Sequence, residues 1–123
     1  MQHLKIFKLE QRDDVIVITP QGEGSAFRYQ DLHLEANTVR QMMMKPENKN
    51  LILDLSELTY FGSEFIGSLV SMMRETRARR GQARFCCANE QMYQVLQGMS
   101  LFKLWPHFDD LDAAILDINE AAS

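Results

Sequence analysis

Histidine, cysteine and serine are the residues of this sequence that could support catalysis or bind a metal. The three histidines, His3, His33 and His107, fall in different predicted elements. None has a cysteine, a histidine or a carboxylate at the spacing of a metal-ligand motif. Neighbouring acids such as Asp109 and Asp110 fall in turns or first helical turns, where acids usually act as solvated caps. The sequence therefore predicts no catalytic residue, no metal site and no cofactor.

The two cysteines, Cys86 and Cys87, are adjacent and fall within a predicted strand. Neighbouring side chains of a strand point to opposite faces, so we do not expect the two thiols to bind one metal or to pair with each other. We interpret them as reduced, partly buried strand residues of a cytoplasmic protein.

Ser63 is the leading candidate for a functional residue. It follows an apolar strand and a glycine-containing turn, and it begins a predicted helix. In open α/β folds, ligands and partners bind at the carboxyl edge of the sheet. The free backbone N–H groups at the start of a helix also favour an anion such as phosphate. By itself, the local pattern favours an ordinary serine N-cap, which stabilises a helix by about 1 kcal/mol.

The composition predicts a single domain over residues 1–123. Hydrophobic residues make up 46% and charged residues 24% of the chain, as in an ordinary soluble globular protein. A net charge of −4 opposes general nucleic-acid binding. We interpret the basic cluster at Arg74, Arg77, Arg79 and Arg80 as a solvated helix end. No apolar run reaches the roughly 18 residues of a membrane span, and the N-terminus has no signal-peptide pattern.

Hydrophobic periodicity predicts an α/β fold. Strands are expected at residues 4–9, 15–20, 50–55 and 83–88, with a short edge strand at 101–105. Helices are expected at residues 27–44, from Ser63 to a stop near Gly81, after the cap residue Asn89, and at 109–118. Residues 21–25, QGEGS, are expected to form a glycine-rich loop, and they lack a phosphate-binding spacing. This order predicts a mixed four- to five-stranded sheet with about four helices layered against it.

The segment LILDLSELTYFGSEFIGSL resembles the STAS domain family of bacterial anti-sigma factor antagonists. That family has an apolar strand followed by DSSGLG or DSTGLG and an apolar helix. Downstream, RGQARFCCANEQMYQVLQGMSLFKLWPHFDDLDAAI is similar to the family's glycine turn, strand, short helix and last helix. Upstream, VIVITPQGEGS takes the place of the second strand and the GELD loop. The resemblance spans nearly the whole chain and implies the STAS fold.

The resemblance implies a binding module that is controlled by phosphorylation, and not an enzyme. In the family, the dephosphorylated domain binds an anti-sigma factor, which is a serine kinase of the histidine-kinase-like ATPase type. The kinase phosphorylates the motif serine, and a PP2C-type phosphatase removes the phosphate. The motif places this serine at Ser63. The implied partner-binding residues are Gly22, Glu23, Ser25, Gly62, Ser63, Glu64, Phe65 and Gly67.

The chain departs from the family motif on both sides of Ser63. Gly62 replaces the motif aspartate, Glu64 the second hydroxyl residue, and Phe65 the first motif glycine. Glu64 puts a fixed negative charge beside the acceptor, where it opposes a phosphate. Phe65 either points outward toward a partner or packs into the core. These departures support an alternative, in which the chain is a non-phosphorylated STAS scaffold, or a subunit of a signalling or lipid-transport complex, and Ser63 is only a cap.

Overall fold

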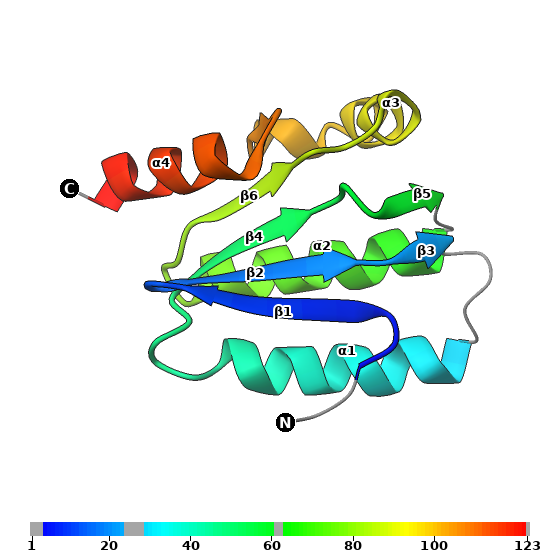
Figure 1. The fold of residues 1–123 in the computed structure, drawn as a ribbon, viewed down its shortest axis with the longest axis horizontal. Coiled ribbons are helices and arrows are strands. Elements are labelled where there is room, and N and C mark those ends of the chain that lie inside the picture. The colour runs from blue at the N-terminus through cyan, green and yellow to red at the C-terminus, as the bar shows by residue number, and fades with distance from the viewer. Residues whose placement is uncertain (1–3, 24–28, 61–62, 123) are drawn as a thin grey trace.

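The computed structural model describes residues 4–23, 29–60 and 63–122 (Figure 1). Its centre is a five-stranded mixed sheet with the strand order β1-β2-β4-β6-β7. The strands are β1 (Phe7–Arg12), β2 (Val15–Pro20), β4 (Asn50–Asp54), β6 (Ala83–Cys86) and β7 (His107–Phe108). β1 and β2 are antiparallel, and each of the other neighbouring pairs is parallel. The predicted mixed α/β sheet is confirmed.

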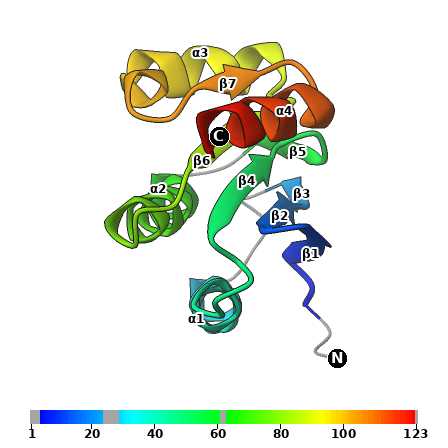
Figure 2. The same cartoon turned by 90° about the vertical axis from the view of Figure 1, so that its left-hand side faces the viewer.

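Four helices of the described chain pack around this sheet. They are α1 (Tyr29–Met43), α2 (Ser63–Ala78), α3 (Glu90–Gly98) and α4 (Leu111–Ala122). Figure 2 shows α1 and α2 on one side of the sheet and α4 on the other. Across the described residues, the structure contains no helix that is both long and apolar enough to cross a membrane.

The sheet is buried on both faces, which explains the nearly continuous apolar run of β4. Leu51 and Leu53 belong to the larger core, which includes buried residues of α1 and α2. Ile52 points the other way and packs with Ala114 and Ile118 of α4. This alternation of side chains also determines which residues at the carboxyl end of the sheet face α4.

The ends of two helices follow from local chemistry. The side chain of Asn89 accepts a hydrogen bond of 2.8 Å from the backbone N–H of Met92, so the predicted N-cap of α3 is confirmed. α2 ends at Ala78, and the left-handed residue after it is Arg80, with a φ of 66°. The N–H of Gly81 then donates to the carbonyl of Thr76 at 2.9 Å. The chain therefore turns near Gly81, as predicted.

The predicted edge strand at residues 101–105 is wrong. Leu101–Lys103 is instead a 3-10 helix, η2, and the edge strand is β7. Leu101 and Trp105 are both buried, and the N–H of Trp105 donates to the carbonyl of Leu101 at 3.0 Å. A helical turn thus brings the two apolar side chains into the core, whereas a strand pairs with the sheet only after Pro106.

Candidate partner-binding site

The helix that carries the candidate serine begins at Ser63, as the sequence predicted. It follows β5 (Leu58–Tyr60), which comes after the carboxyl end of β4 in the chain. The start of α2 and β5 lie at the same end of the molecule (Figure 1). Ser63 therefore lies at the carboxyl edge of the parallel strands, where α/β proteins meet ligands and partners.

A second small sheet brings the predicted glycine-rich segment to this edge. β3 (Gly22–Glu23) pairs in parallel with β5, and the aligned residues are Gly22 with Leu58 and Glu23 with Tyr60. The chain around Gly22 and Glu23 thus lies beside the segment that leads to Ser63. The sequence predicts a loop for these residues, because a strand of two residues has no periodicity to detect.

The remaining predicted site residues differ in how far the structure describes them. Ser25 and Gly62 lie outside the described residues. Ser63 and Glu64 are described as the first residues of α2, without their side chains. Phe65 and Gly67 are described fully.

Phe65 adopts the inward one of its two expected orientations. Its side chain is 2% exposed, and its ring stacks on that of Phe7 with 5.9 Å between the ring centroids. This burial corrects the expectation that the Phe65 ring contacts a partner. The ring instead attaches the first turn of α2 to the core, beneath β1.

Gly67 is exposed on α2, four residues after Ser63. Residues four apart lie on the same face of a helix, so Ser63 and Gly67 share a face. Beyond its own helical turn, no described heavy atom lies within 4 Å of the place where a Cβ of residue 67 would be. Glycine inside a helix costs roughly 0.5–1 kcal/mol relative to alanine. Packing within the described chain therefore gives no reason for glycine at this position.

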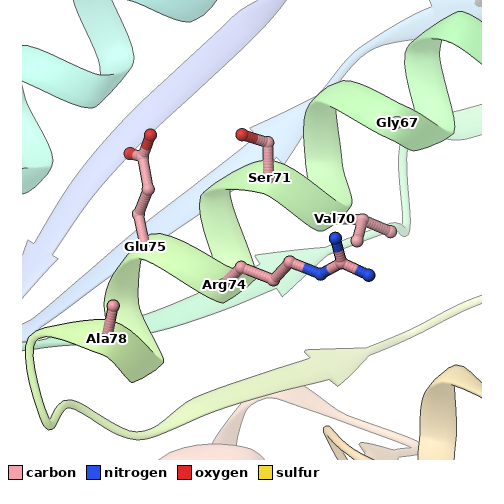
Figure 3. Close-up of a pocket in the computed structure, with 6 residues that line it drawn as sticks. All are labelled: Gly67, Val70, Ser71, Arg74, Glu75 and Ala78. Carbon is pink, nitrogen blue, oxygen red and sulfur yellow. The ribbon is translucent and has the colours of Figure 1, made fainter.

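A shallow groove continues from Gly67 along the outer side of α2 (Figure 3). Its lining residues are Gly67, Val70, Ser71, Arg74, Glu75 and Ala78. In Figure 3, Ser71 and Glu75 extend to one side of the helix, while Arg74 lies along it toward Val70. The groove therefore combines a small-residue floor at Gly67 with an exposed cation at Arg74.

Arg40 of α1 supports the side of this groove that carries Ser71 and Glu75. Its Nη2 donates a hydrogen bond of 2.7 Å to Oγ of Ser71, and its Nε lies 3.4 Å from Oε1 of Glu75. These contacts connect α1 to α2 and hold both polar side chains in place.

A separate cluster at the sheet edge contradicts one prediction. The ligand atoms of Asp54, Cys86 and Cys87 all lie within 4.8 Å of one another. The sequence predicts that the two cysteines lie on opposite faces of one strand. β6 ends at Cys86, however, and Cys87 has a φ of 63°, so the alternation of a strand does not extend to Cys87. Burial raises the pKa of both thiols, and the negative charge of Asp54 raises it further.

A comparison against protein families agrees with the fold. The family model of the STAS domain matches residues 7–114. The chain therefore belongs to the STAS domain family. This identification confirms the resemblance carried by the segment around Ser63.

Solved structures show the same fold. An anti-sigma-factor antagonist (STAS) domain protein from Planctomyces limnophilus is similar at 22% identity, with 92% of this chain and 97% of that chain covered and a TM-score of 0.76. An anti-sigma factor antagonist from Mycobacterium paratuberculosis has 19% identity, covers 92% of both chains and has a TM-score of 0.75. The Bacillus cell fate determinant SpoIIAA in its phosphorylated form has 20% identity, covers 90% of this chain and 96% of that one, and has a TM-score of 0.70. At these identities, the likeness is one of fold.

Proposed function

We propose that the chain is a cytoplasmic regulatory module of the anti-sigma factor antagonist type, whose binding to an anti-sigma factor kinase is controlled by phosphorylation of Ser63. The module catalyses no reaction itself. Its function is to present one face to a partner and to lose that partner when Ser63 carries a phosphate. A PP2C-type phosphatase restores the binding form.

The observation that carries this proposal is the shared face of Ser63 and Gly67 on α2. Gly67 has open space around it, although alanine would stabilise the helix. A partner whose backbone packs closely against this turn explains the glycine. Such a partner would also cover Ser63, one turn earlier on the same face.

A phosphate on Ser63 would act locally. The start of a helix such as α2 favours an anion, because the first backbone N–H groups of a helix have no acceptor within the helix and its dipole is positive there. A phosphoserine carries about −1.5 to −2 charges at neutral pH, so a partner that covers it must remove water from those charges. This desolvation free energy destabilises the complex and leaves the free protein unchanged, because the phosphate of the free protein stays in water. Phosphorylation therefore releases the partner.

The pairing of β3 with β5 supports a second segment in the same face. It brings Gly22 and Glu23 beside the chain that leads into Ser63. We propose that Gly22, Glu23 and Ser25 border the interface, together with Gly62 and Glu64. Phe65 contributes from beneath, because its buried ring fixes the first turn of α2.

The test combines phosphorylation with binding. The protein is incubated with ATP and the histidine-kinase-like ATPase encoded nearest to its gene, and the mass of the intact protein and of its peptides is measured. We expect one added phosphate, located at Ser63. Ser63→Ala should gain no phosphate and still bind the kinase, whereas Ser63→Asp should bind more weakly in calorimetry.

Ser68→Ala provides the matched control, because Ser68 lies on the same helix outside the motif. It should be phosphorylated and bind as wild type does. If Ser63→Asp binds as tightly as wild type, the switch is refuted. A stable stoichiometric complex without any phosphate at Ser63 would instead support the scaffold alternative. The departures from the family motif at Gly62 and Glu64 favour that alternative.

A further inference from the structure

Asp54, Cys86 and Cys87 form a cluster of potential metal ligands at the carboxyl edge of the sheet. Asp54 is the last residue of β4, Cys86 is the last residue of β6, and the two are aligned partners in these parallel strands. Both therefore point to the same face of the sheet, the one covered by α4. Pairing of the two strands brings a carboxylate and a thiol together at one level of the sheet.

The conformation of Cys87 adds a second thiol to this pair. Its φ of 63° is left-handed, which is uncommon for a residue other than glycine. Its N–H donates to the carbonyl of Phe108 at 3.0 Å, which continues the pairing with β7 beyond the end of β6. The Sγ atom of Cys87 then lies within 4.8 Å of both Sγ of Cys86 and a carboxylate oxygen of Asp54. The backbone thus turns the second thiol toward the first.

These spacings are close to those around a tetrahedral metal ion. Zinc binds cysteine sulfur at about 2.3 Å and carboxylate oxygen at about 2.0–2.2 Å, so ligand atoms around it lie somewhat less than 4 Å apart. Small side-chain rotations would bring the three atoms to that spacing. Two sulfur ligands and one oxygen ligand favour zinc or a similarly thiophilic ion over magnesium or calcium, which prefer oxygen ligands.

The surroundings support the three ligands in different ways. Cys86 is fully buried beside Ile52 and Ala114, so its thiol is fixed by packing. Asp54 and Cys87 are half-buried, which leaves the cluster open to an ion from the sheet edge. One carboxylate oxygen of Asp54 accepts a hydrogen bond of 3.0 Å from the N–H of Ser56. This bond orients the carboxylate beside the two thiols.

We propose that Asp54, Cys86 and Cys87 bind a thiophilic divalent cation of the zinc class. The ion would hold the ends of β4 and β6 together and would have three protein ligands. A fourth position remains for water or for a group from a partner, as in zinc sites that are not purely structural. The proposal does not rest on the phosphorylation of Ser63.

Cadmium provides a direct probe, because cadmium–thiolate bonds absorb in the ultraviolet. The reduced protein is titrated with Cd²⁺, and then the bound Cd²⁺ is competed with Zn²⁺. We expect one equivalent to bind, with the absorbance of two thiolates, and Zn²⁺ to displace it. Cys87→Ser should lose about half of the absorbance and bind about 10- to 100-fold more weakly, and Asp54→Asn should keep the absorbance but also bind more weakly.

Asp112→Asn is the control, because Asp112 is an exposed carboxylate outside the cluster. It should bind Cd²⁺ as wild type does. Absence of thiolate absorbance in wild type at equimolar Cd²⁺, or unchanged binding in Cys87→Ser, would overturn the proposal. Alkylation of the wild-type protein, with and without Zn²⁺, tests the proposal even if a variant fails to fold. Zn²⁺ should slow alkylation of Cys87 by iodoacetamide, and an unchanged alkylation rate would also overturn the proposal.

Discussion

The Nε–H of Arg84 donates a hydrogen bond to Oδ2 of Asp117 over 2.6 Å and connects β6 to α4. The Arg84 side chain is 10% exposed, and its other nitrogens donate to the carbonyl of Ala83 and to Oε1 of Gln82. Each of the three guanidinium nitrogens of this nearly buried side chain thus donates a hydrogen bond. α4 covers the face of the sheet that carries Asp54 and Cys86. This ion pair therefore also holds α4 in place over the proposed metal site.

Loss of the Asp117 carboxylate should destabilise the fold. Asp117→Ala leaves the guanidinium of Arg84 buried with one hydrogen-bond partner fewer, and we expect the free energy of unfolding to fall by about 1–2 kcal/mol. Urea denaturation measures this change. Asp112→Ala is the control, since the Asp112 side chain is 93% exposed and its Oδ1 lies 3.8 Å from Nη1 of Arg12. This substitution should change the free energy of unfolding by less than about 0.5 kcal/mol. Equal effects of the two substitutions would contradict the role of Arg84.

Gly81 should tolerate no side chain. A Cβ at this position would collide with the carbonyl oxygen of Lys49 and crowd the methyl group of Thr76. The Lys49 carbonyl cannot easily move, because the next residue, Asn50, is fixed by two hydrogen bonds. The N–H of Asn50 donates to the carbonyl of Asp14 at 2.9 Å, and its Oδ1 accepts from the N–H of Gln82 at 2.8 Å. We expect Gly81→Ala to lower the free energy of unfolding by about 1–3 kcal/mol in urea denaturation.

Gly98→Ala is the matched control for the Gly81 substitution. Gly98 ends α3, and no described heavy atom beyond its own turn lies within 4 Å of its would-be Cβ. Alanine there should leave the stability within about 0.5 kcal/mol of wild type. If Gly81→Ala behaves in the same way, the close approach to Lys49 is not rigid.

Gly67→Ala should separate folding from partner binding. Alanine fits the open space on α2 and should raise the free energy of unfolding by about 0.5–1 kcal/mol. In the proposed complex, the same methyl group would stand between α2 and the partner, so we expect affinity to fall about tenfold or more in calorimetry. A variant that is more stable and binds the kinase normally would show that the partner does not pack on this turn.

His107 should make stability depend on pH. Its Nε2 accepts a hydrogen bond of 3.1 Å from the N–H of Ala88, which requires the neutral ring. Burial lowers the pKa of His107 below its ordinary value, and the charge of Asp109 opposes this shift only in part. The rings of Tyr93 and Phe102 pack against it, at centroid distances of 5.0 and 5.3 Å.

The direction of this pH dependence follows from the lowered pKa. As pH falls through the ordinary histidine pKa, the unfolded chain binds the proton first, so the free energy of unfolding decreases until the folded protein is protonated too. His107→Gln keeps an acceptor for Ala88 but does not titrate. Its urea midpoint should therefore change less than that of wild type between about pH 8 and pH 5. The same pH dependence in both proteins would exclude His107 as its source.

The sequence by itself determined the elements with a strong periodic signal. β2 and β4 are long apolar runs, and α2 has its serine at the start and regularly spaced apolar residues on one face. The cap of Asn89 was equally local, because it depends on residues three positions apart. The family resemblance, carried by ordered motifs along the whole chain, indicated the site around Ser63. Such signals need no knowledge of distant residues.

Tertiary structure decided the features that depend on contacts between distant segments. β3 and β5 are too short for periodicity and exist only because they pair with each other. Phe65 had two open orientations, and the neighbouring Phe7 of β1 fixed the inward one. Leu101–Lys103 became a 3-10 helix, because the turn that it begins buries both Leu101 and Trp105.

The cysteines show most clearly why sequence alone was insufficient. Alternation along a strand separates Cys86 from Cys87, and that rule holds only while the strand continues. The strand ends between them, and the left-handed φ of Cys87 turns its thiol back toward Asp54. The backbone angle φ of Cys87, whose N–H pairs with β7, thus decided whether two adjacent thiols lie close enough to bind one metal ion.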